Sequence, residues 1–408
     1  MQSSKPEPSL IRSLTLTHAI LYGLGVTIGA GIYVLVGVAA GRSGMHAPLA
    51  FLAAAIAMGL TAASFAELGT RMPVSASEAA YVEAAFHRRW LSLGMGLLVI
   101  ATATVSAATI SAGSAGYIGV FVPWPATWII VGVVLATGAV ACLATVQSIA
   151  FAGLMTLIEV GGLLLIIVAG LGQGTEVFSR LPEVFPAPDN FGAWKSVAST
   201  TLIAVFAFIG FEHLVNIAEE MKEPSRTLPR ALFITLGVTT MLYVLVLWIS
   251  VIVVTPEELA RSPAPLATVF QRLTGLPLIV MAVIAVVATL NGIVVHMIMI
   301  ARVVYGMADQ GNLPQSLAKV NAVTKAPLVA TVIAVGGILF LSLAVPLEGL
   351  AELASRGALV IFAGINLALI SIKRRGPSAP SGTFNCPLWV ACAGLVASLL
   401  LLAFDLMP

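Results

Sequence analysis

The chain consists of long apolar segments separated by short polar ones. A helix needs about 20 consecutive, predominantly apolar residues to cross a bilayer, and eleven segments meet this length. We expect each segment to form a helix, which makes the chain an all-α polytopic membrane protein with about 11 transmembrane helices. The segments are 16–40, 47–70, 92–121, 126–145, 149–172, 197–218, 231–254, 277–304, 327–346, 350–372 and 387–405.

The composition supports this reading and narrows the function. The 408 residues are 59% hydrophobic and only 9% charged, whereas soluble domains carry roughly 25% charged residues. A net charge of +2 is too small to indicate nucleic acid. The three cysteines form no C-x-x-C pair and no cluster at metal-ligand spacing. Because no constellation of catalytic residues stands out, we expect neither an enzyme nor a cofactor.

Lysine and arginine set the expected orientation. Cytoplasmic loops of membrane proteins carry an excess of both residues. If residues 1–12 form a retained cytoplasmic tail, 14 of the 20 Lys and Arg residues fall on the inner side. We therefore expect a multi-pass protein of the cell (cytoplasmic) membrane with a cytoplasmic N-terminus.

Two of the apolar segments are interrupted by glycine near their middle. The first reads GVTIGAGIY over 25–33 and the second FAFIGFE over 206–212. Irregular backbone at membrane depth occurs only where it is buried in protein or lines a cavity, and broken helices typically form the binding sites of secondary transporters. The interruptions lie in the first and sixth segments, which predicts two inverted repeats of five spans. The predicted divisions are 1–15 as a cytoplasmic tail, 16–172 as the first repeat, 173–196 as an extracellular loop, 197–372 as the second repeat, and 373–408 as an inner loop with span 11.

The first interruption has two readings. Small residues let the backbone unwind, and the freed amide groups at the start of the second half-helix suit a carboxylate. The predicted substrate contacts here are Ile28, Gly29, Ala30 and Gly31. The other reading is helix packing, because Gly25 and Gly29 have the G-x-x-x-G spacing of close helix pairs.

The second interruption complements the first. Unwound carbonyl groups at Phe206, Ala207 and Ile209 would accept hydrogen bonds from an ammonium group, and Phe208 and Gly210 complete the predicted contacts. A positive half-helix end facing free carbonyl groups describes a receptor for a zwitterion. Packing of the aromatic rings in the core is the alternative, but it does not explain a glycine followed closely by a carboxylate.

Several motifs together resemble the amino acid–polyamine–organocation (APC) permeases. The stretch GAGIY at 29–33 is similar to their first-span signature. The sixth-span signature is similar to FAFIGFE at 206–212 with EEMKEP at 219–224 and RTLP at 226–229. ARVVYGMA at 301–308 resembles the end of their eighth span. The likeness covers roughly the first 375 residues and is greatest to bacterial relatives of cationic amino acid transporters.

The resemblance implies a LeuT-type fold and the uptake or exchange of amino acids. It places Phe206 where family members have an aromatic ring that covers the substrate, and Glu212 where many have a carboxylate thought to sense protons. Ser106 and Ala107, with Thr102 and Ile110 nearby, would give a compact and largely apolar compartment for the substrate side chain.

Glu159 departs from the family pattern. Proton-coupled relatives have a lysine in the fifth span, and this segment has none. Burial favours the neutral form of a carboxyl group, so Glu159 is a candidate proton carrier beside Glu212. Sodium binding and uncoupled exchange are the alternatives.

The sequence therefore predicts a secondary active amino acid permease that works by alternating access and is coupled to protons. An amino acid exchanger or an amine transporter is the alternative, and a non-transporting nutrient sensor is a more remote one. The partners expected are the amino acid, the lipid bilayer and protons, without nucleic acid or metal. Polar residues such as His213, Asn291, His296 and Asn366 are interpreted as hydrogen-bond partners between helices.

Overall fold

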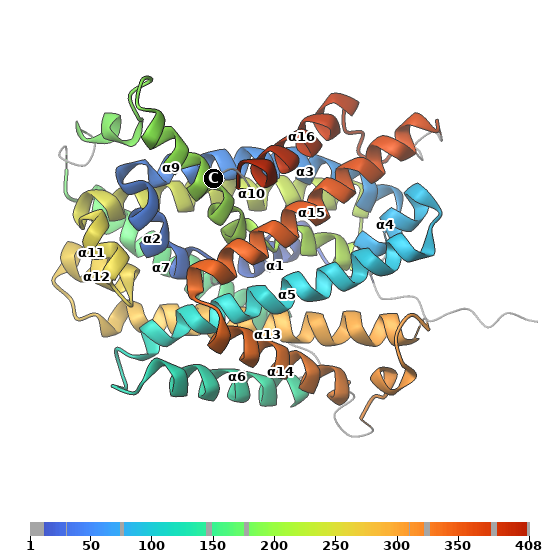
Figure 1. The fold of residues 1–408 in the computed structure, drawn as a ribbon, viewed down its shortest axis with the longest axis horizontal. Coiled ribbons are helices and arrows are strands. Elements are labelled where there is room, and N and C mark those ends of the chain that lie inside the picture. The colour runs from blue at the N-terminus through green and yellow to red at the C-terminus, as the bar shows by residue number, and fades with distance from the viewer. Residues whose placement is uncertain are drawn as a thin grey trace, which may run out of the picture.

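A computed structural model describes residues 12–29, 31–73, 77–143, 149–174, 179–309, 311–321, 327–376 and 382–405. Regular structure within these residues is helical, with one isolated backbone bridge between Leu14 and Met221. The longest helices run side by side along the molecule (Figure 1). Helix α5 packs along α13 and α15, and α3 packs along α10. Their bounds are α3 Ala47–Arg71, α5 Arg89–Ile118, α10 Pro224–Val253, α13 Ile279–Asp309 and α15 Leu347–Arg374.

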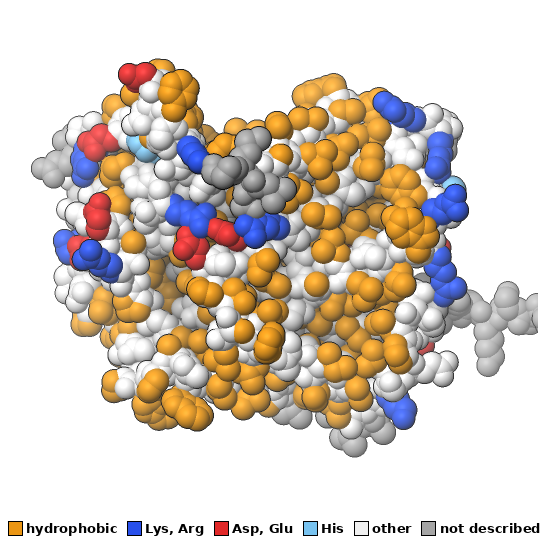
Figure 2. All heavy atoms as spheres, viewed as in Figure 1, with side chains coloured by type: hydrophobic (Ala, Val, Ile, Leu, Met, Phe, Trp, Pro, Cys, Tyr) orange, Lys and Arg blue, Asp and Glu red, His pale blue; other side chains and the backbone are white. Residues whose placement is uncertain are grey.

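The helices have the length and composition of a multi-pass membrane protein. Among the described residues, seven helical stretches are long and apolar enough to cross a membrane, and four apolar helices are shorter. Hydrophobic side chains spread over the face in Figure 2, and Lys and Arg lie along its right-hand end, at its left edge and near its centre. Each predicted segment coincides with a helix or a pair of helices, while the number of spans stays a prediction. The other long helices are α6 Ala126–Leu143, α7 Ile149–Leu171, α14 Leu328–Ala344 and α16 Leu388–Asp405.

Both predicted interruptions are confirmed as ends of helices. Helix α1 (Leu16–Ile28) stops before Gly29, and α2 (Gly31–Ser43) begins two residues later. Helix α9 (Phe191–Phe208) stops before Ile209 and Gly210, and the 3₁₀ helix η3 (Phe211–Glu220) follows. The first and sixth apolar segments are thus each divided into two helical halves.

Gly210 explains why the second interruption needs glycine. Its φ of 124° lies in a region that residues with a side chain rarely adopt. A Cβ atom at this position would also lie 2.8 Å from the backbone oxygen of Val26. The glycine therefore permits both the turn and the close approach of α1.

The connections contain helices that the hydrophobic pattern did not predict. Helices α11 (Pro256–Arg261) and α12 (Pro265–Thr274) lie between the seventh and eighth predicted segments, and α11 packs on α2. The contact is close, since a Cβ atom on Gly37 would lie 2.8 Å from the backbone oxygen of Leu259. These helices are short and partly polar, so a search for apolar spans misses them. The remaining short elements are η1 Gly44–His46, α4 Ser77–Phe86, η2 Leu181–Val184 and η4 Gln315–Ala318.

Candidate functional site

The two interruptions pack directly against each other. A Cβ atom on Gly31 would lie 2.7 Å from the Cα atom of Ala207, so the start of α2 touches the end of α9. The hydroxyl group of Tyr243, on α10, lies 2.9 Å from the backbone oxygen of Thr27 and 3.0 Å from that of Ala207. A single buried tyrosine therefore links the backbones of both broken segments.

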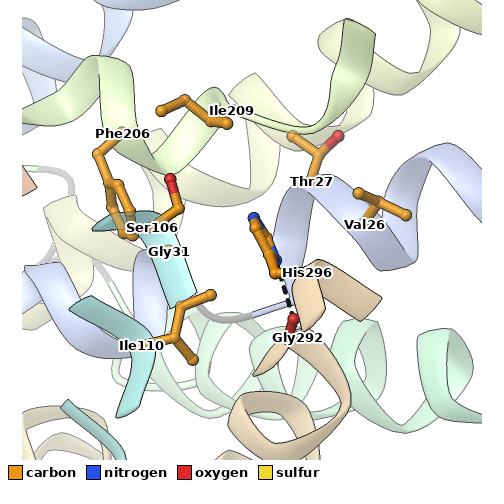
Figure 3. A pocket seen from close by; sticks show the side chains of 9 residues that line it. All are labelled: Val26, Thr27, Gly31, Ser106, Ile110, Phe206, Ile209, Gly292 and His296. Atoms are coloured by element: carbon orange, nitrogen blue, oxygen red, sulfur yellow. Dashed lines mark hydrogen bonds between the residues drawn. The ribbon is translucent and has the colours of Figure 1, made fainter. Parts of the chain in front are cut away.

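A small cavity lies beside this junction (Figure 3). Thr27 and Ser106 are 2% and 1% exposed, and their hydroxyl groups have no hydrogen-bond partner among the described residues. A buried hydroxyl group without a partner is costly, so a bound molecule that offers polar atoms would stabilise this arrangement. The lining residues are Val26, Thr27, Gly31, Ser106, Ile110, Phe206, Ile209, Gly292 and His296.

The predicted substrate contacts fall into two groups. Gly31, Ser106, Phe206 and Ile209 line the cavity, and Ile110 joins them. The other predicted contacts that the structure describes do not line the cavity. Ala30 is not among the residues that the structure describes. Those outside the lining are Ile28, Gly29, Ala107, Ala207, Phe208 and Gly210.

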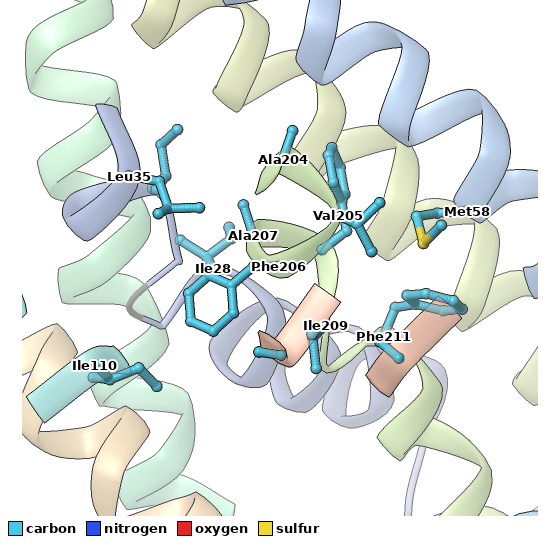
Figure 4. Close-up of a cluster of buried hydrophobic side chains, with 14 of the residues drawn as sticks. Ile28, Leu35, Met58, Ile110, Ala204, Val205, Phe206, Ala207, Ile209 and Phe211 are labelled. Atoms are coloured by element: carbon cyan, nitrogen blue, oxygen red, sulfur yellow. The ribbon is translucent and has the colours of Figure 1, made fainter. Parts of the chain in front are cut away.

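The residues outside the lining mainly support the cavity. Ile28 belongs to the buried apolar cluster that also holds the ring of Phe206 (Figure 4). The ring of Phe208 lies 5.3 Å from that of Tyr243, measured between centroids. Two of the three predicted carbonyl acceptors already have partners, because the Phe206 oxygen accepts from the Ile209 amide and the Ala207 oxygen from Tyr243. A carbonyl oxygen has two lone pairs, so each can accept a second hydrogen bond.

Four lining residues, Val26, Thr27, Gly292 and His296, were absent from the predicted contacts, as was the linking residue Tyr243. Val26 and Thr27 lie within the motif at 25–33, so their position close to Gly31 in the sequence could have identified them as lining residues. Gly292 and His296 lie on α13. This helix has apolar residues on all its sides, so the sequence does not indicate which side faces the cavity.

Glu159 lies on α7, fully buried. Its Oε1 atom accepts a hydrogen bond of 2.9 Å from the side chain of Asn291 on α13. Its backbone oxygen accepts one of 2.7 Å from the hydroxyl group of Tyr33 on α2. The Oε2 atom has no partner within the described part of the chain. The expected role of Asn291 as a partner between helices is confirmed.

Glu212 faces a second small cavity that adjoins the first. Its Oε2 atom accepts from the Gly210 amide at 2.8 Å, and its Oε1 atom lies 3.9 Å from Nε2 of His213. Ile209 and His296 line both cavities. No Lys or Arg is among the lining residues of the second cavity, which are Glu78, Val99, Thr102, Ala103, Ile209, Glu212, His213, His296, Met299, Ala358, Ile361 and Phe362.

The arrangement suits the binding of a small polar molecule inside a membrane. A helix start at Gly31, buried hydroxyl groups and apolar side chains converge on one cavity between two broken helices. This combination is typical of secondary transporters, which bind their substrates at such interruptions.

Comparison with known proteins identifies the family. The sequence profile described as amino acid permease matches residues 14–408, and the chain belongs to this family, within the APC superfamily. The branched-chain amino acid permease BcaP of Bacillus subtilis is 30% identical over 404 residues, covering 93% of this chain and 85% of that protein. The predicted resemblance is thereby confirmed, and the family comprises transporters rather than enzymes.

Larger eukaryotic proteins are similar over most of this chain. The vacuolar cationic amino acid transporter 2 of Arabidopsis thaliana is 30% identical over 399 residues, which is 89% of this chain and 60% of that protein. Cationic amino acid transporter 4 of Mus musculus is 28% identical over 408 residues, which is 93% of this chain and 63% of that protein.

Proposed function

We propose that this protein carries an amino acid across the cell membrane by alternating access, with its N-terminus in the cytoplasm. Spans 1–5 (16–172) and 6–10 (197–372) would form the inverted repeats of a LeuT-type fold, with an extracellular loop at 173–196. The observation that carries the proposal is the single junction of two broken helices around a cavity with unpartnered hydroxyl groups. Family membership supports amino acid transport.

The junction suggests how a zwitterion binds. The amide groups of Ala30 and Gly31 hold the carboxylate, because the start of α2 is the positive end of a helix. The carbonyl groups of Phe206, Ala207 and Ile209 accept hydrogen bonds from the ammonium group. Both charged ends of the substrate would then be bound by backbone of the two interruptions.

The lining favours a neutral, aliphatic side chain. Val26, Ile110, Phe206 and Ile209 supply apolar surface, and a bacterial relative is named a branched-chain amino acid permease. A cationic amino acid or an amine is the second candidate, supported by the carboxyl groups of Glu78 and Glu212 in the adjoining cavity and by the cationic amino acid transporters among the relatives.

Proton coupling is assigned to Glu159, with Glu212 as a second carrier. The carboxyl group of Glu159 joins α7 to α13 through Asn291, so its protonation would act on the contact between these two helices. Its unpartnered Oε2 atom offers a place for the proton. Exchange without coupling, or a sodium ion at the same carboxylate, would instead leave uptake insensitive to a proton gradient.

Uptake of radiolabelled amino acids into proteoliposomes tests the transport proposal. Gly31→Val should abolish uptake while the protein stays folded, because the new side chain meets the backbone of Ala207. Gly59→Val is the matched control, since a Cβ atom there meets nothing within 4 Å. Uptake by the Gly31 variant at the wild-type rate would remove the site. A wild-type protein that binds an amino acid without delivering it into the vesicle would instead be a sensor.

An imposed proton gradient tests the coupling proposal. Uptake by the wild type should rise with an inward gradient, and Glu159→Gln should lose this response because the amide cannot exchange a proton. Replacing external sodium with potassium under the same conditions tests the sodium alternative. A wild-type rate that ignores the proton gradient would remove Glu159 from coupling.

A further inference from the structure

His296 stands on α13 at the boundary of the two cavities. It is 5% exposed and lines the first cavity together with Thr27, Ser106 and Gly31. It also lines the second cavity, where its ring centroid lies 6.1 Å from that of His213. The side chain therefore lies where a bound molecule would meet it, rather than between two packed helices.

The hydrogen bond of His296 fixes the chemistry of its free nitrogen. Its Nδ1 atom lies 2.8 Å from the backbone oxygen of Gly292, four residues earlier on the same helix. A carbonyl oxygen only accepts, so Nδ1 carries the proton and donates it. In the neutral ring the Nε2 atom is then bare and can only accept. Among the described residues, His296 forms no ion pair that would favour the charged form of its ring.

This free nitrogen points into the first cavity. In Figure 3 it lies on the side of the ring away from Gly292, facing the space bounded by Thr27 and Ile209. The hydroxyl groups of Thr27 and Ser106 either donate or accept, whereas Nε2 offers a lone pair alone. The lining thus includes one side-chain atom that requires a donor, beside a helix start that suits an acceptor.

We propose that Nε2 of His296 accepts a hydrogen bond from the ammonium group of the bound amino acid. This inference rests on the proposed function and adds a side chain of α13 to contacts with the charged groups of the substrate that are otherwise made by the backbone of the two interruptions. An ammonium group has three hydrogens to donate, so His296 and a carbonyl group at the second interruption can be engaged together. The substrate would thereby tie α13 to both broken segments.

The test removes each partner of this bond separately. Binding to the purified protein is measured for L-leucine and for 4-methylpentanoate, which is the same molecule without the amino group. The ratio of the two dissociation constants is compared between the wild type, His296→Leu and His296→Gln. His46→Leu is the control, because His46 also bonds a backbone oxygen through Nδ1 but lies outside both cavities.

The proposal predicts that the wild type prefers L-leucine strongly and that His296→Leu reduces this preference by about 10-fold to 100-fold, the usual contribution of a hydrogen bond to a charged group. His296→Gln retains more of the preference, since its amide oxygen accepts, and His46→Leu retains all of it. An unchanged ratio in His296→Leu, or equal losses in both His296 variants, would overturn the inference. If the wild type does not prefer L-leucine or any other amino acid over its deaminated analogue, the proposed function fails instead.

Discussion

Helix α15 carries a cluster of ion pairs at each end, and the two clusters differ in burial. Near its start, Glu348 and Glu352 bind Arg42 of α2, with 2.5 Å between Arg42 Nε and Glu348 Oε1. The side chain of Arg42 is 26% exposed, that of Glu348 48% and that of Glu352 20%. Near its other end, Lys373 lies 2.9 Å from Glu67 of α3, a side chain that is 0% exposed.

The buried cluster is also the more extensively bonded one. Glu67 accepts from Arg71 at 2.6 Å and from the backbone amide of Cys386 at 2.7 Å. Lys373 also donates to the backbone oxygen of Cys386. The Glu67 cluster therefore joins α3, α15 and the segment before α16 into one unit.

The difference in burial indicates at which end of α15 the ion pairs separate more easily. Partly exposed ion pairs contribute about 0–1 kcal/mol, whereas breaking a buried pair costs about 3–5 kcal/mol because one charge is left uncompensated. The Arg42 cluster holds α2, one half of the first broken segment, so separating it frees an element of the site. The Glu67 cluster instead holds α3, α15 and the segment before α16, none of which lines the first cavity.

Glu67→Gln should have the largest effect on stability. Loss of the carboxylate leaves Lys373 and Arg71 beside a buried neutral group, so we expect a destabilisation of about 3–5 kcal/mol. Thermal unfolding of the detergent-purified protein measures it. Unfolding at the wild-type temperature would show that the burial of this cluster carries no energetic weight.

Arg42→Met should destabilise the folded protein by less than about 1 kcal/mol while changing transport. Without the ion pairs, α2 separates from α15 more often, and a thiol placed in the cavity by Ser106→Cys should react faster with a membrane-impermeant reagent added from the Arg42 side. An unchanged reaction rate in Arg42→Met would contradict the inference that these ion pairs hold α2 against α15.

Cys386 provides the smallest and most local test. Burial, reinforced by the neighbouring Glu67 carboxylate, raises the pKa of its thiol to about 11. At pH 8 the thiol is therefore protonated and reacts slowly, since the thiolate is the nucleophile. We expect Glu67→Gln to speed its alkylation, as measured by mass spectrometry. Fast alkylation of Cys386 in the wild type at pH 8 would contradict the tight packing of the Glu67 cluster.

The sequence predicted the features that depend on local composition. Apolar length placed the helices, and the glycines at 29, 31 and 210 located both interruptions because glycine permits turns and the close approach of another backbone. Asn366 was expected to join helices, and it does so through Ser64 and Thr61 on α3. These predictions needed no knowledge of which side of a helix faces which neighbour.

The features that depend on helix rotation could not be predicted. Helix α13 is apolar on all sides, so nothing in its sequence indicated that Gly292 and His296 face the cavity. Tyr243 likewise lies within a long apolar run, and its two backbone partners are far away in sequence. The short helices α11 and α12 were missed because packing on α2, rather than apolar length, stabilises them.

The central claim is that the cavity between the two interruptions binds the transported amino acid. It is tested most directly by substrate protection of Ser106→Cys in a protein whose three native cysteines are replaced by alanine, with a small thiol reagent that crosses the membrane. The account predicts that saturating amino acid slows modification of this cysteine and that modification stops uptake. Modification at the same rate with and without the amino acid, in a variant that still transports it, would contradict the account.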